Sequence, residues 1–555
     1  MKYLLNKKND MKKFNKIMIF LLLSSFALTG CSDLLDVDSN REVFVDEYQL
    51  KSANDTLYSM FAIFSQLEKI ADSYVLLGEL RGDLMTVTDK SGLYLKEINN
   101  FNISANNPYA NNIKDYYSVI NNCNYVIHNI DTSIVKNGNK VMYKEYAACK
   151  AIRAWTYMQI ALNYGSAIYY DKPILTVIDA ENIQKEQAKT ITELATILIE
   201  DIKPWKDIDE PSLGSIYTHY NSDSFFPIRF ILGDLYLWLG QYENAANEYH
   251  DLMFKNEYIM RSDLKSSREV INKAFTGNFS VNWLYSFNSN FPEVITSIAA
   301  TNEYGQQFDL DSLTLNRMIA PSEVAINNWD KQMYYHSNSL DTLGDLRKYG
   351  SVSVSTDQLF DINTVPTTNY YIYKFILMNP VSDTKHTDKE IMPYRITLLY
   401  LRYAEAVNRL GKPNLALAVL KNGLNTNSLI NRKIIPQNEL SDPLPNYMNF
   451  SDILFSGNIG VRMHGCGNVN TDTTYYVIPK LDAIQDSVLY VEDLIQQELA
   501  LETAFEGNRF HDLMRIAIRR DDPSYLANIV SEKHTDNKQV IKAKLLDPIN
   551  WYIKK

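Results

Sequence analysis

The chain has 555 residues and is acidic, with 55 Lys and Arg against 66 Asp and Glu and a formal net charge of −11. One hydrophobic core stops growing near ~250–300 residues, so we expect two or more units or an elongated helical array. An acidic chain without a basic run argues against nucleic acid as a partner.

The N-terminus has the order of a secretory signal. A cluster of lysines precedes an apolar run that starts at Ile17. This run of about ten residues is too short to anchor a chain across a bilayer. It ends in Leu28-Thr29-Gly30-Cys31, which resembles the lipobox of bacterial lipoproteins. That resemblance implies that residues 1–30 are a signal peptide and that Cys31 carries lipid.

The segment after Cys31 bears on localisation. Lipidated proteins need more than one acyl chain for stable anchoring, and the lipobox implies several. The acidic residues Asp33, Asp36 and Asp38 resemble the export tag of surface lipoproteins of Bacteroidetes. We therefore expect an outer-membrane protein that is lipid-anchored and faces the cell surface. No later apolar stretch is long enough to span a membrane.

The remaining cysteines are Cys123, Cys149 and Cys466, an odd number that implies no disulfide framework. Cys123 and Cys149 are able to pair, but both lie in helical patterns, where buried free thiols are common. We favour free thiols.

Apolar periodicity predicts a mainly helical chain. An alanine-rich face runs from Ala147 to Leu162 and stops at Gly165. Two later segments, 231–253 and 396–424, each place an apolar stripe before Leu-Gly and an alanine five residues after the glycine. This is the spacing of a tetratricopeptide unit, in which glycine turns the chain and alanine seats the second helix. We expect two such helix pairs, separated by large insertions.

Helical periodicity is lost between about 260 and 390, where Asn, Ser, Thr, Asp and aromatic residues are frequent. Alternating runs such as 283–287 and 370–375 predict short strands joined by long loops. Loops of this length are usually functional. Residues 431–480 read as a second irregular region, and the last 30 residues give no clear pattern.

Several motifs, taken in chain order, resemble those of the SusD/RagB-like nutrient-binding outer-membrane lipoproteins of Bacteroidetes. They include an E-L-R-x-D element, a Y-x-x-I-x-x-x-N helix, an L-R-A-x-x-Y helix, an L-R-Y-A-E-A helix and a closing F-E-G-x-R element; their positions here are 79–83, 117–124, 152–157, 401–406 and 505–509. The resemblance implies a SusD-like helical scaffold divided into 31–260 and 261–555, with a loop-rich insertion at 261–390.

Charged residues of these motifs also predict packing. Glu498, Glu502, Glu506, Arg509, Asp512 and Arg515 follow one another at helical spacings. They form an ion-pair set able to tie the last helices to the core, which we favour over a carboxylate pair for acid–base chemistry. Arg153, Arg402 and Glu405 lie on apolar helices, so they need partners.

The sequence has no metalloprotease, serine-hydrolase, nucleotide-binding or Cys-x-x-Cys motif. His464 and Cys466 alone do not make a metal site, and we expect neither metal nor cofactor. Glycan sites use aromatic platforms with polar partners. Two regions offer them: the first holds Arg81, Asp83, Tyr94, Asn106, Asn107 and Tyr109, and the second holds Tyr304, Trp329 and Tyr334.

The family resemblance implies a receptor without enzymatic activity, which captures oligosaccharide as the lid of a SusC-like TonB-dependent outer-membrane barrel. Three alternatives stay open from the sequence: an oligopeptide receptor of the RagB type, a surface lipoprotein hydrolase, and a helical scaffold without a small ligand. The sequence does not identify the ligand.

Overall fold

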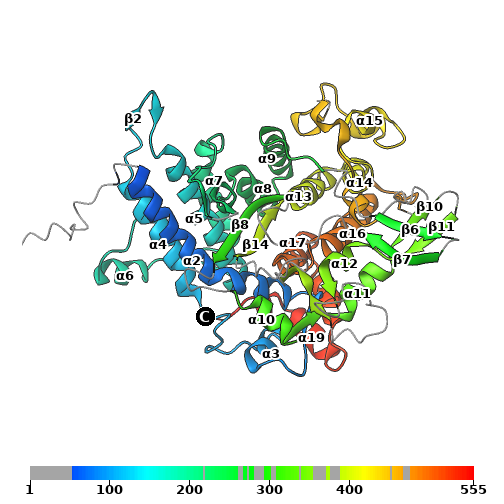
Figure 1. The fold of residues 1–555 in the computed structure, drawn as a ribbon, viewed down its shortest axis with the longest axis horizontal. Helices are drawn as coiled ribbons and strands as arrows, with labels where there is room; N and C mark the ends of the chain where they lie inside the picture. The colour runs from blue at the N-terminus through cyan, green and yellow to red at the C-terminus, as the bar shows by residue number, and fades with distance from the viewer. Residues whose placement is uncertain are drawn as a thin grey trace, which may run out of the picture. The chain divides into compact units, whose positions relative to one another are not determined.

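The computed structural model describes residue 50 and residues 53–216, 219–260, 267–271, 274–280, 293–301, 308–336, 339–353, 370–375, 388–450, 453–466 and 476–554. Helices dominate this part of the chain (Figure 1), which confirms the predicted fold class. Their bounds are α2 Ala53–Glu79, α3 Leu93–Asn99, α4 Ile113–Asn129, α5 Tyr143–Tyr164, α6 Val177–Ile183, α7 Ile191–Ile202, α8 Ile228–Leu239, α9 Tyr242–Lys255, α10 Leu310–Leu315, α11 Glu323–Asp330, α12 Arg347–Ser351, α13 Ile396–Arg409, α14 Pro413–Lys421, α15 Thr426–Ile430, α16 Ile484–Glu502, α17 Arg509–Arg520, α18 Pro523–Ser531 and α19 Lys538–Leu545.

Both predicted helix pairs are present, as α8 with α9 and α13 with α14. Gly240 and Gly411 follow the first helix of each pair with φ of 72° and 76°, a left-handed conformation that favours glycine. Ala245 and Ala416 are wholly buried in the second helices. Since α13 also packs against α9, the two pairs lie together although 411 − 240 = 171 residues separate their turns.

Helix α5 is the centre of the N-terminal half. Its predicted alanine face is buried, but so is every residue from Ala147 to Tyr164, because α2, α4, α7 and α8 all pack around it. Gly165 ends the helix at φ 83°, as predicted. Trp155 lies in the core, 1% exposed.

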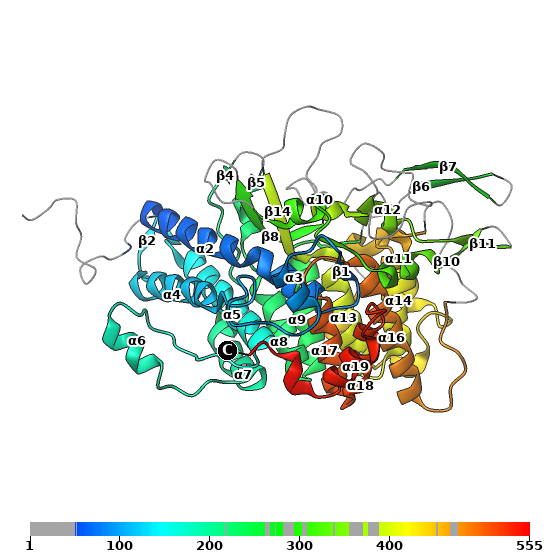
Figure 2. The ribbon, with the colours of Figure 1, turned by 90° about the horizontal axis from the view of Figure 1, so that it is seen from below.

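The predicted insertion contains short strands in two-stranded antiparallel sheets. The longest pair joins β8 (Val294–Thr301) to β14 (Asp388–Arg395), and β1 (Met85–Val87) pairs with β9 (Ile319–Pro321). Figure 2 shows these strands and the pairs β6–β7 and β10–β11 along one side of the helices. The other strands are β2 Val135–Lys136, β3 Asn139–Lys140, β4 Ser215–Ile216, β5 His219–Tyr220, β6 Ser267–Ile271, β7 Ala274–Ser280, β10 Met333–His336, β11 Ser339–Leu343, β12 Val352–Ser353 and β13 Tyr371–Ile372.

The prediction for this region was incomplete, because α10, α11 and α12 also lie in it. Helices of five to eight residues are too short to show a helical period in sequence. The alternating run at 370–375 gives only a two-residue strand and a 3₁₀ turn, and the run at 283–287 lies outside the described residues.

Residues 431–480 are irregular where described, with several 3₁₀ turns, while the C-terminal stretch folds into α18, α19 and a final 3₁₀ turn, Pro548–Trp551. The described residues from Leu50 onward pack as one unit, and the domain boundary after residue 260 stays a prediction. Cys123, Cys149 and Cys466 are buried thiols that are not in disulfide bonds, as favoured above. Of the helices described, none has both the length and the hydropathy to cross a membrane.

Candidate functional site

The first and last motifs of the family resemblance bind each other. Glu79, at the end of α2, accepts hydrogen bonds from the backbone N–H groups of Phe505 (3.1 Å), Gly507 (2.8 Å) and Arg509 (3.4 Å). Burial raises the pKa of Glu79 to about 7. A Cβ atom on Gly78 would lie 1.8 Å from the Gly507 carbonyl oxygen, so the two segments meet backbone to backbone. The two motifs are halves of one structural contact.

Asp83, a predicted ligand residue, belongs to the same contact. Its Oδ1 and Oδ2 accept from Arg509 Nε (2.6 Å) and Nη2 (3.1 Å), and both side chains are buried. Nearby, Lys533 Nζ donates to the carbonyl oxygens of Leu80 (2.6 Å) and Met85 (2.8 Å). Burial lowers the pKa of Lys533 to about 7. These bonds give Asp83 a structural role, and its contact with a ligand stays a prediction.

Arg81, from the same motif, is buried without a carboxylate partner in the described part of the chain. Its guanidinium donates to the carbonyl oxygens of Leu77 (2.7 Å) and Trp551 (2.9 Å) and to the Asn163 amide oxygen. It also lies 4.5 Å from the centre of the Phe510 ring. Burial lowers the pKa of Arg81 to about 10.

A hollow of about 190 Å³ adjoins Arg81. Its walls are the segment Phe101–Ile103 after α3 and the C-terminal residues Asn550–Lys554, with Lys544 of α19 beside them. Asn102 and Lys554 are exposed, so the hollow opens at the surface. Sequence reasoning missed its C-terminal wall, because the last 30 residues carry no periodic pattern.

Tyr94 lies on α3, and Asn106, Asn107 and Tyr109 lie in the loop that follows this helix; we call residues 93–110 together the α3 loop. Tyr94 is 40% exposed, Asn106 is exposed and Tyr109 is half-buried. Asn107 is wholly buried and braces the loop, donating to the Tyr94 carbonyl (2.9 Å) and to Glu97 (3.0 Å) while accepting from the Tyr109 N–H (3.1 Å). Burial, together with Asp309 and Asp72, raises the pKa of Tyr109, so its phenol remains neutral and able to donate.

The second predicted region is placed differently. Trp329 is wholly buried, and its indole donates to the Leu501 carbonyl (3.0 Å). Tyr334 is 1% exposed and donates to Asp345 Oδ2 (2.5 Å). Both side chains pack inside the molecule and are not brought together with the α3 loop at an exposed face. Tyr304 and Cys31 lie outside the described residues.

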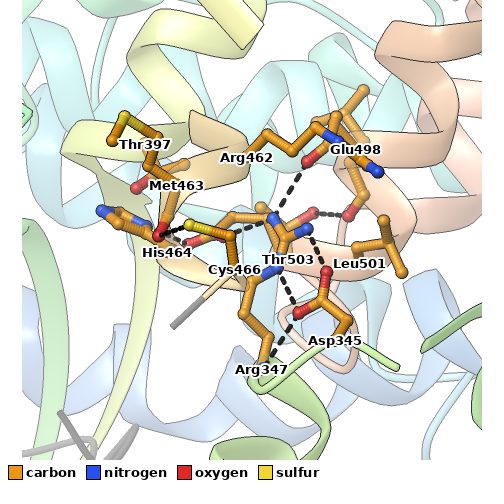
Figure 3. Close-up of polar contacts among 12 residues, drawn as sticks. Asp345, Arg347, Thr397, Arg462, Met463, His464, Cys466, Glu498, Leu501 and Thr503 are labelled. Atoms are coloured by element: carbon orange, nitrogen blue, oxygen red, sulfur yellow. Dashed lines mark hydrogen bonds and ion pairs between the residues drawn. The ribbon is translucent and has the colours of Figure 1, made fainter. Parts of the chain in front are cut away.

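The charges of α16 and α17 form a buried network, as predicted, but mostly with partners on other elements. Figure 3 shows the part of this network around Glu498 of α16, with Arg347, Arg462 and Asp345. Arg347 Nη1 lies 3.0 Å from Glu498 and 2.9 Å from Glu502, and Arg462 Nη1 lies 3.0 Å from Glu498. The other contacts continue this pattern: Arg395 with Glu293, Glu502 and Glu506, Lys374 with Glu506, Arg402 with Asp512, and Arg515 with Glu405 and Asp512. The prediction that these charges tie the last helices to the core is confirmed.

Other predicted partners were found as well. Arg153 pairs with Asp201 (2.6 Å), and Arg402 and Glu405 pair as given above. His464 lies 3.3 Å from Glu502; burial alone would lower the pKa of His464, but Glu502 and Glu293 raise it. Cys466 Sγ donates to the Met463 carbonyl (3.3 Å). Among the residues that the structure describes, no three His, Cys, Asp or Glu side chains are placed to hold a metal ion.

Comparisons with known proteins agree with this architecture. Residues 328–547 match the model of the SusD family, and no curated protein matches the chain. A SusD superfamily protein of Bacteroides thetaiotaomicron is 15% identical, with 89% of this chain and 93% of that chain covered at a TM-score of 0.55. Bacteroides fragilis NanU is 18% identical, with 88% of this chain and 93% of that chain covered at a TM-score of 0.53. A SusD-like carbohydrate binding protein of Bacteroides vulgatus is 17% identical, with 83% of each chain covered at 0.52.

At such identities the structural likeness establishes the fold, while the family model adds a sequence signature. The predicted resemblance is thereby confirmed: this chain has the SusD fold over most of its length, and its residues 328–547 carry the signature of the SusD family.

Proposed function

We propose that the protein is a nutrient-binding lipoprotein of the outer membrane that captures oligosaccharide at the cell surface. The observation that carries this proposal is the SusD fold, with its family signature, on a chain whose N-terminus resembles a lipobox at Cys31. One protein of the same fold is described as carbohydrate-binding. Acyl chains on Cys31 would hold the protein on the membrane without a spanning helix.

The α3 loop is the proposed saccharide contact. Tyr94 and Tyr109 offer aromatic faces, and Asn106 offers an exposed amide in the same segment of the chain. An aromatic ring with convergent polar groups suits the apolar and hydroxyl-bearing sides of a sugar. Because Asn107 fixes the loop by its hydrogen bonds, little conformational freedom is lost on binding.

The proposed mechanism is binding and release, with no bond made or broken. The protein would act as the lid of a SusC-like TonB-dependent barrel and pass its ligand inward. The motif carboxylates Glu79, Asp83, Glu502 and Asp512 are each engaged by backbone N–H groups or buried cations, which supports a structural role. Affinity for a short ligand should be modest, since an open loop buries few groups.

Titration calorimetry on the full-length protein in detergent tests this proposal against panels of neutral oligosaccharides and oligopeptides. Tyr94→Ala and Tyr109→Ala should each weaken saccharide binding about tenfold, the effect of removing an anchoring side chain. Tyr490→Ala is the matched control, because Tyr490 is half-buried like Tyr109 but lies on α16. Equal weakening by all three variants would contradict the proposed contact.

Other outcomes identify the alternatives. Binding of peptides alone would establish an oligopeptide receptor of the RagB type. Turnover of a glycan or peptide that vanishes on substitution of one carboxylate would establish a hydrolase. Stable capture of a barrel partner without any small ligand would favour a scaffold.

A further inference from the structure

The hollow beside Arg81 is strongly cationic for an acidic protein. Three of its wall residues, Arg81, Lys544 and Lys554, are cations, and none is Asp or Glu. The chain as a whole carries a formal net charge of −11. Cations gathered without carboxylates repel one another, so an anion placed among them is stabilised.

Arg81 differs from the other arginines that are almost completely buried. Arg153, Arg347 and Arg395 each form ion pairs with carboxylates, as described above. Arg81 instead has the Leu77 and Trp551 carbonyls, the Asn163 amide and His511 as polar neighbours. His511 supplies no negative charge, and burial, with Arg81 and two further arginines, lowers its pKa well below its usual range.

The donors of Arg81 are not all used. Nε and Nη1 each donate once to a carbonyl, and Nη2 has two neighbours, Asn163 and His511. A guanidinium has five N–H groups, so one N–H of Nη1 has no acceptor within the described part of the chain. A buried donor without an acceptor is costly unless a ligand or water supplies one.

Lys544 stands at the rim of the same hollow in a fixed position. Its Nζ donates to the Phe101 carbonyl (2.5 Å) and to the Asn102 side-chain oxygen (2.5 Å). Burial and the neighbouring Lys554 lower the pKa of Lys544. Lys544 and Lys554 therefore line the same small space as Arg81, and the other residues that line it are neutral.

We propose that this hollow binds a carboxylate group of the nutrient, so that the receptor prefers acidic ligands. This inference rests on the proposed function. A volume of about 190 Å³ is below the ~300–1,000 Å³ of pockets that enclose whole drug-sized ligands. It therefore admits one end of a ligand while the rest stays outside. The carboxylate can belong to a uronic acid or to the C-terminus of a peptide, since both present the same two oxygens to Arg and Lys donors.

Calorimetry on the full-length protein in detergent separates these sources. The probes are glucuronate and glucose, and one tripeptide with a free and with an amidated C-terminus. We expect the acid of the matching pair to bind at least tenfold more tightly than its neutral counterpart, with the preference declining as salt rises. Preference within the sugar pair identifies a uronic acid, and preference within the peptide pair identifies a peptide C-terminus.

Variants locate the effect. Lys554→Gln should reduce binding of the acid about threefold, as for an exposed charge, and Lys544→Gln about tenfold. Lys433→Gln, an exposed lysine that does not line the hollow, should change nothing. Arg81→Gln can disturb folding, so the two lysine variants carry the test.

Equal affinity for acid and neutral probes in both pairs would overturn this inference while leaving the proposed receptor function intact. So would an acid preference that survives Lys554→Gln and Lys544→Gln. Absence of binding by every saccharide and peptide would instead overturn the proposed function, and the inference with it.

Discussion

Asp83→Asn should destabilise the folded protein by about 3–5 kcal/mol. This substitution removes the charge that faces Arg509, whose guanidinium makes two hydrogen bonds to Asp83 in a buried site. Removing one partner of a buried pair leaves the other as an uncompensated charge, which costs about that much. Since domains are stable by only ~5–15 kcal/mol, the loss is a large share of the total.

Urea unfolding followed by tryptophan fluorescence measures this loss. The free energies of the variants can be compared when the free energy of unfolding falls with urea concentration at the same slope in each. The matched control is Glu532→Gln, which breaks a pair with Lys538 at 2.6 Å whose side chains are 54% and 39% exposed. Exposed pairs contribute ~0–1 kcal/mol, so this control should scarcely move the midpoint.

A double-mutant cycle isolates the pair. Arg509→Met alone should also cost about 3–5 kcal/mol, and the double variant should cost clearly less than the sum, because neither partner is then left alone. If Asp83→Asn costs no more than Glu532→Gln, the reasoning that Asp83 serves structure is refuted. Asp83 would then be free to serve a ligand, as the sequence suggested.

Three further predictions concern packing, pH and anchoring. Gly233→Ala should lower the free energy of unfolding by about 1–3 kcal/mol, measured by thermal melting, because the new Cβ would lie 2.2 Å from the Tyr249 ring. Gly457→Ala, with open space around it, should cause no measurable loss. Equal losses would contradict close packing of α8 on α9. Lys533 has a pKa of about 7 in the folded protein, against its ordinary value of 10.5. Between pH 7 and pH 10.5 the unfolded state therefore binds one more proton than the folded state. The free energy of unfolding should rise with pH in this range, by up to about 1.4 kcal/mol per pH unit. Urea unfolding at pH 7, 8 and 9 should show this rise in the wild type and a flatter profile in Lys533→Met; parallel profiles would refute it. Cys31→Ser should abolish labelling by radioactive palmitate and release the protein from the membrane fraction, and retention of both would disprove the lipobox assignment.

The helix pairs could be predicted because their signals are local. Gly240 and Gly411 follow apolar stripes, and the alanines that seat the second helices stand at a fixed distance from them. The need for partners at Arg402 and Glu405 was equally readable, since a charge on an apolar helix has few alternatives. The identity of these partners could not be predicted from the sequence, because Asp512 and Arg515 lie more than a hundred residues away from Arg402 and Glu405.

The candidate site was harder to predict from the sequence. In irregular segments no period tells a buried aromatic residue from an exposed one, so Trp329 and Tyr334 were chosen by residue type and prove to be buried. The backbones of Tyr94 and Tyr109 are linked through Asn107, because only a short stretch of chain separates the three residues. The hollow beside Arg81 joins residues more than 400 positions apart, a neighbourhood that only the fold creates.

The contact between the first and last motifs sets an order of events during synthesis. The ribosome releases Asp83 426 residues before Arg509. At ~5–20 residues per second, that interval lasts roughly 20 to 85 seconds. Throughout this interval the C-terminal end of α2 lacks the segment that it contacts in the folded protein. This part of the nascent chain therefore stays unpaired until the last helices emerge and pack against the first.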